Sequence, residues 1–170
     1  MLVQLIKSGR FLAKALVLED NPRRLAFAMA LGMVVGVVPK GNLTAVLLML
    51  GILSLRVNLV AVFLSAILFS IFSATCDPIC HLIGSGLLHA SIFEPLWTFF
   101  FSLPFAEWTA LNNTVVLGSL VLSIYLFYPT YLASYMAIEG FQPWIRVKIK
   151  RFKIIQLLTP MSLLPRLKKA

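Results

Sequence analysis

The feature that most constrains this chain is a long central stretch that is almost free of charge. Residues 25–139 carry only two basic side chains, Lys40 and Arg56, and four acidic ones. Of all 170 residues, 60% are hydrophobic and 12% are charged, about half the charged share of soluble domains. A chain with so few charges lacks the polar side chains that a water-exposed surface needs, so the sequence predicts an all-α integral membrane protein.

Both ends of the chain are basic. Residues 1–24 hold five basic side chains and two acids, whereas residues 140–170 hold eight basic side chains and no acid. Because Lys and Arg collect on the cytoplasmic side of membrane proteins, we expect both termini in the cytoplasm and an even number of crossings. The formal net charge of +9 predicts anionic lipid headgroups as partners, and no nucleic acid, since the middle is so apolar.

The first apolar segments are short. Residues 2–18 predict an amphipathic helix at the inner interface, within an N-terminal segment 1–21 that ends at an N-cap, Asn21. Two arms follow, 25–38 and 43–55, with helical lengths of about 21 and 20 Å against ~30 Å of hydrocarbon. We expect these arms to form a helical hairpin over residues 22–58 that re-enters the membrane from the cytoplasmic side.

Two longer apolar runs are expected to cross the membrane within residues 59–138. Residues 59–76 and 115–138 give helices of about 27 and 36 Å, the second kinked at Pro129. The aromatic segment 77–114 between them has three acids and no Lys or Arg, and is predicted to form an outer interfacial loop with short helices. The predicted fold is thus a re-entrant helical hairpin plus two transmembrane helices, with interfacial amphipathic helices at both ends.

Alternatives remain for the hairpin and the tail. Both arms could cross as tight full spans, which gives four crossings with the same ends inside. One broken span over residues 25–55 would put the basic tail outside, so three crossings are rejected. In the basic cytoplasmic tail, 139–170, Ile145 to Lys153 alternates apolar and basic residues, but a lone strand would lack backbone partners and a helix is preferred.

The break between the arms, Pro39-Lys40-Gly41-Asn42, concentrates polar groups. A re-entrant tip lies at a depth similar to the outer end of the first crossing, where Asp77 stands. An unpaired charge there costs at least about 2.5 kcal/mol, so we expect Lys40 to pair with Asp77, directly or through water. With the N–H groups that begin the second arm, Lys40, Gly41 and Asn42 would form an anion site for a phosphate or carboxylate headgroup.

Each of these polar residues also has a simpler interpretation. Lys40 could extend to the outer surface, and Asp77 could cap a short helix that starts at Pro78. Arg56 and Asn58 are expected at the inner interface, as anchors or as further headgroup contacts. Cys76, Cys80, His81 and His89 lack the spacing of a metal site, so no metal and no cofactor is expected.

A ladder of small residues predicts close helix packing. Ala28, Gly32 and Gly36 recur every fourth residue up to Pro39, and such a spacing lets a second backbone approach one helix face. No catalytic constellation is visible, so we expect no enzyme. Two functions are predicted: transport or translocation of an anionic substrate or lipid headgroup at the tip, by a homo-oligomer, or a non-transporting membrane anchor for a partner enzyme.

The same residues carry a resemblance. The run from Ala28 to Leu43, followed by Arg56-x-Asn58 and Asp77-Pro78, resembles a bacterial family catalogued as domain of unknown function 2062, over about residues 20–90. The resemblance implies a multi-pass bacterial inner-membrane protein with no assigned activity. Members of the family are sometimes joined to glycosyltransferase domains, which would be consistent with a role in lipid-linked sugar or phosphate chemistry. No such domain is expected in this chain. Asp77 replaces an Asn of that pattern, which favours the charge pair.

Overall fold

A computed structural model describes residues 21–151, and the side chains of residues 21–141. The predicted N-terminal helix over 2–18 and the last part of the basic tail lie outside the described residues. The helices are α2 (Pro22–Val37), α3 (Leu43–Leu53), α4 (Leu59–His89), the 3₁₀ turn η1 (Ser91–Phe93), α5 (Glu94–Phe101), α6 (Ala106–Thr109) and α7 (Thr114–Arg151). No strand occurs within residues 21–151, so the all-helical prediction is confirmed for this part.

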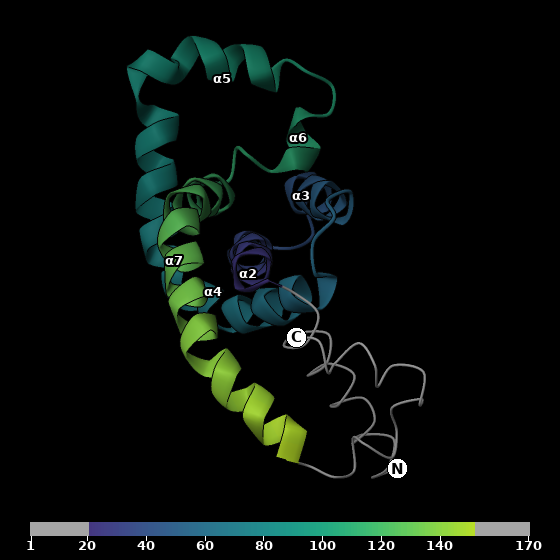
Figure 1. The fold of residues 1–170 in the computed structure, drawn as a ribbon. Coiled ribbons are helices and arrows are strands. Elements are labelled where there is room, and N and C mark those ends of the chain that lie inside the picture. Colours follow the sequence, from purple (N-terminus) through teal and green to yellow (C-terminus); the bar gives the residue numbers. More distant parts are fainter. Residues whose placement is uncertain (1–20, 152–170) are drawn as a thin grey trace.

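Helix α2 forms the centre of the fold. It packs on α4 and α7 and, over a smaller area, on α3, and Figure 1 shows the three neighbours around it. Most of its apolar side chains are buried, because three helices cover them. Phe27 on α2 meets Phe127 on α7 edge to face, with ring centroids 5.7 Å apart.

Asparagine caps fix where the helices begin. Asn21 accepts a hydrogen bond from the Arg23 N–H (3.1 Å), with Pro22 at the first helical position as the sequence predicts. Asn42 caps α3 by accepting from the Ala45 N–H, and Asn58 caps α4 by accepting from the Ala61 N–H. The turns at 38–42 and 54–58 therefore separate α2, α3 and α4 into distinct helices.

Helix α4 is longer than predicted. It continues through Asp77 and Pro78 to His89, so the prediction that Asp77 caps a new helix is wrong. Pro78 removes one hydrogen bond, to the carbonyl of Ala74, but packing on α7 supports the next turns. Figure 1 shows α4 changing direction along its length, the effect that an interior proline produces.

The segment between α4 and α7 consists of short helices. Glu94 and Pro95 begin α5, whereas Pro104 lies in the turn before α6, so prolines mark breaks where the sequence places them. Helix α7 then continues past the predicted crossing, through Pro129, to Arg151. The basic residues from 146 to 151 are helical, as preferred over a strand, and they extend α7 instead of forming a separate element.

Among the described residues, two helices are long and apolar enough to cross a membrane, Leu59–His89 and the part of α7 from Thr114 to Phe141. Only 17% of the most apolar stretch of α4 and 28% of that of α7 is buried within the chain. A core helix of a soluble domain would bury most of this surface. The exposed apolar surface of both helices is therefore of the kind that lipid or another protein covers.

Candidate anion site at the hairpin tip

The tip between α2 and α3 is a tight turn built from its own side chains. Gly41 has φ +95°, a left-handed conformation that favours glycine, and a Cβ there would meet open space. The Asn42 side chain bonds in both directions, donating through Nδ2 to the Pro39 carbonyl (2.8 Å) and accepting from the Ala45 N–H (2.8 Å). These bonds hold Lys40 at the end of α2.

The ammonium group of Lys40 is held between two helices. It donates to the carbonyl of Gly36, one of the last in α2, and to the hydroxyl of Ser70 on α4 (2.9 Å). Ser70 in turn donates to the Ala66 carbonyl (2.6 Å) and also lies 3.1 Å from the Gly36 carbonyl oxygen. An ammonium has three donors, so these two partners leave one for a ligand.

The pairing of Lys40 with Asp77 is not formed directly. No ion pair joins the two within the described residues, because Lys40 uses Ser70, which precedes Asp77 by seven residues of α4. Seven residues of helix measure about 10 Å, beyond direct contact. Asp77 itself is half-buried within α4. The prediction of a direct Lys40–Asp77 pair is therefore wrong, and Lys40 contacts Ser70 instead.

Two helix ends of opposite sign meet at the tip. The C-terminal end of α2 is negative and is compensated by the ammonium of Lys40, whereas the N-terminal end of α3 is positive and faces the tip. A negatively charged group at the tip would be favoured by the remaining donor of the ammonium and by the positive end of α3.

Small residues bring α2 onto α4, as their spacing predicts. A Cβ added to Gly32 would collide with the Val62 carbonyl and lie 2.7 Å from the Cβ of Ser65. One added to Gly36 would lie 2.7 Å from the Cβ of Phe69. Ala28 is fully buried one turn earlier. This close approach places the Gly36 carbonyl beside Ser70 and thereby makes the lysine contact possible.

Arg56 and Asn58 do not join the tip. They lie in the turn at the other end of α3, whose 11 residues measure about 17 Å. Asn58 is the cap of α4, and Arg56 is exposed in the same turn. The predicted headgroup residues therefore fall into two places, one at each end of α3.

The segment before α7 contacts the first turn of α3, which is the end of α3 opposite the turn 54–58. The hydroxyl of Thr44, in the first turn of α3, donates to the carbonyl of Thr109 at the end of α6 (2.7 Å). Phe105 and Trp108 beside this contact are 68% and 71% exposed. Figure 1 shows α6 next to α3, with α5 further from α2. Helix α6 is thus a lid over one side of the tip.

Sequence reasoning missed the residues on α4 that complete this geometry. Ser70 is one serine among several in an apolar run, and such serines commonly bond the carbonyl four residues earlier, as Ser70 also does. Ser65 was missed as well, although it is buried and donates to the Met29 carbonyl of α2 (2.6 Å). Ser65 and Ser70 are five residues apart, which is not the spacing of one helix face, so the sequence offered no signal that both contact α2.

Over the described residues 21–151, the fold is all-helical, with two helices of membrane-spanning length and α2 packed between them. The chain belongs to the family described as "Uncharacterized protein conserved in bacteria (DUF2062)", which it matches over residues 7–145. The resemblance seen in residues 20–90 is thereby confirmed. An "Uncharacterized protein" of Treponema pallidum (strain Nichols) is 25% identical over 138 residues, 81% of this chain and 85% of that protein. No solved structure is significantly similar.

Proposed function

We propose that this chain is a multi-pass protein of the bacterial inner membrane that binds an anionic substrate or lipid headgroup at the tip of a re-entrant hairpin and moves it across the bilayer. In this proposal α4 and α7 cross the membrane, and α2 and α3 enter from the cytoplasmic side and return. Binding and movement need no covalent step, so the protein is not proposed to be an enzyme. The basic ends favour cytoplasmic termini.

The contact of Lys40 with Ser70 is the observation that carries the proposal. Ser70 lies 11 residues after Leu59, about 17 Å along α4, while the hydrocarbon layer measures ~30 Å. If α4 starts at the inner interface, the tip reaches the middle of the bilayer. A charged side chain at that depth is costly, and such groups mark substrate and ion pathways.

The shortness of the hairpin favours a re-entrant hairpin instead of two helices that each cross the membrane fully. Helix α3 has 11 residues and a length of about 17 Å, so it covers only about half of the hydrocarbon. Irregular backbone at membrane depth is tolerated where protein buries it or where it lines a wet cavity, and the tip lies against α4 and α6. Short interrupted helices of this kind form binding sites in transporters.

Reconstitution tests the proposal. The purified full chain in phosphatidylcholine vesicles should move a fluorescent phosphatidylglycerol between leaflets, so that external dithionite bleaches more than the outer half. In a parallel assay, the vesicles should be tested for uptake of inorganic phosphate, which separates a lipid headgroup from a free anion. If the protein is inactive in both assays, the proposal is contradicted. A pathway needs more than two crossings, so we also expect a homo-oligomer, and a monomeric mass in mild detergent would count against that part.

The continuation of α7 favours a second candidate, a membrane anchor or assembly factor for a partner enzyme. The helix runs ten residues past Phe141, the end of its membrane-length part, into a sequence that contains Arg146, Lys148 and Arg151. A basic helix leaving the membrane is suited to an acidic protein surface or to anionic lipid. Loss of cellular function on truncation after Ile145, with function retained on Lys40→Ala, would favour this candidate.

The lid contact yields a prediction. Thr44→Val removes the hydroxyl that donates to Thr109 while keeping the shape of the side chain, so α6 should separate more often from α3. We expect about a threefold rise in amide hydrogen exchange of residues 106–110, with little change in α2. Thr98→Val, which removes an exposed hydroxyl bonded within α5, is the control. Equal exchange in both variants would show that the bond does not hold the lid.

A further inference from the structure

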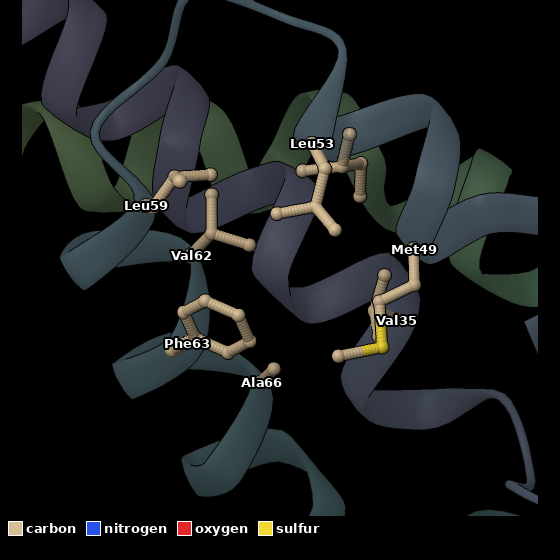
Figure 2. Close-up of a pocket in the computed structure, with 8 residues that line it drawn as sticks. Val35, Met49, Leu53, Leu59, Val62, Phe63 and Ala66 are labelled. Atoms are coloured by element: carbon tan, nitrogen blue, oxygen red, sulfur yellow. The ribbon is translucent and has the colours of Figure 1, made fainter. Parts of the chain in front are cut away.

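An apolar groove lies between α3 and α4 and runs from the turn 54–58 to Ala66, one turn before Ser70. Its floor is made of buried residues from three helices, and its rim of exposed ones (Figure 2). The floor is Val35, Ile52 and Val62, each at most 6% exposed, and the rim is Met49, Leu53, Leu59 and Phe63, each 37–47% exposed, with Ala66 at the far end. All eight lining residues are apolar, and the groove opens to the outside of the chain.

The groove starts at the turn 54–58. Leu53 is the last residue of α3 and Leu59 the first of α4, and Figure 2 shows both next to the ribbon that joins the two helices. From Leu59 to Ala66 the groove follows seven residues of α4, about 10 Å. It is therefore a slot with one end at the turn and its length along the helices.

Arg56 stands in that turn. It is the only charged residue in the sequence between Lys40 and Asp77, and its side chain is exposed. Among the described residues no hydrogen bond or ion pair engages its guanidinium. Within the part of the chain that the structure describes, a cation with no acidic partner thus lies where an apolar groove begins, which is the charge pattern that complements an anionic amphiphile.

We infer that this groove binds one acyl chain of an anionic phospholipid, with the lipid phosphate at Arg56. A guanidinium presents paired N–H donors that match two phosphate oxygens, and the rim residues would cover the first part of the chain. The floor is already buried by α2, and the enclosed part of the groove measures only about 30 Å³, so the acyl chain would lie along a shallow groove between α3 and α4. The inference needs only the groove and Arg56, and it stands apart from binding at Lys40.

The headgroup end is tested by charge removal. The full chain in mild detergent is incubated with phosphatidylglycerol or phosphatidylcholine, and retained lipids are counted by native mass spectrometry. Arg56→Gln should weaken phosphatidylglycerol retention about fivefold to tenfold and phosphatidylcholine retention less, because the choline cation offsets the attraction of its phosphate to Arg56. Arg24→Gln removes an equal exposed charge from the first turn of α2 and is the control. Equal losses in both variants would overturn the inference in favour of general surface charge.

The acyl end is tested by filling the slot. Met49→Trp places a large ring in the groove and should reduce retention of both lipids at least threefold. Leu50→Trp adds the same ring to the neighbouring residue, which is exposed and does not line the groove, and should have no such effect. Equal retention in the two variants overturns the inference. So does a change of oligomeric mass in Met49→Trp alone, which would identify a second copy of the chain as the occupant.

Discussion

Gly84→Val and Gly118→Val are expected to destabilise the fold by about 3 kcal/mol each, the upper end of the usual cost of overpacking. A Cβ on Gly84 would collide with the backbone of Thr114, and one on Gly118 with the backbone of Cys80. Backbone cannot move aside as a flexible side chain does, so α4 and α7 would have to separate. Thermal unfolding of the purified chain in one detergent measures the loss as a lowered midpoint.

Gly86→Val is the matched control, because Gly86 lies in the same helix and a Cβ there would meet nothing within 4 Å. Its effect is expected within about 0.5 kcal/mol, as for other open surface positions. If Gly84→Val and Gly86→Val unfold at the same temperature, then the close contact of α4 with α7 does not hold the fold together.

Lys40→Ala is expected to abolish leaflet exchange of phosphatidylglycerol, reducing the rate by at least tenfold. The change removes the ammonium that we propose to meet the phosphate, whereas the Gly36 carbonyl and Ser70 hydroxyl stay bonded to each other. Losing a charge-assisted hydrogen bond costs about 1.5–3 kcal/mol, which corresponds to roughly 10-fold to 150-fold. The vesicle assay with dithionite measures the rate at matched protein content.

Two variants distinguish this effect from a loss of folding. Lys40→Arg keeps the charge and should keep part of the rate, and Asp77→Asn should keep at least half, since Asp77 lies two turns beyond Ser70. If Asp77→Asn abolishes exchange as fully as Lys40→Ala, the two groups act as a pair and the lysine–serine account fails. If Lys40→Ala keeps the full rate, the tip is not the site.

Local sequence signals located the hairpin well. Proline, glycine and asparagine at 39–42 predicted the turn, and the structure ends α2 at Val37 and caps α3 with Asn42. These residues act on their own backbone, so their effect can be deduced without the partner helices. The arms were predicted at 25–38 and 43–55 and are found at Pro22–Val37 and Leu43–Leu53.

The partner of Lys40 could not be deduced in the same way. It depends on the register of α2 against α4, which Gly32, Gly36 and Ser65 fix only after packing. At Asp77-Pro78 the local residues misled the prediction. The pair alone predicts a helix start, but packing on α7 keeps α4 continuous through it. Contacts of Cys80 and Gly84 with α7 keep α4 helical beyond the proline.

The depth of the tip is tested most directly by spin labels on single cysteines at Leu43, Leu55 and Leu103, in the full chain with Cys76 and Cys80 replaced by alanine. In lipid bilayers, oxygen collides with labels in the hydrocarbon, and a water-soluble nickel complex collides with labels at the surface. We predict little nickel contact at Leu43, beside the tip, and high nickel contact at Leu55 and Leu103. High nickel contact at Leu43 as well as at Leu55 would place the tip on the far surface and contradict the re-entrant hairpin.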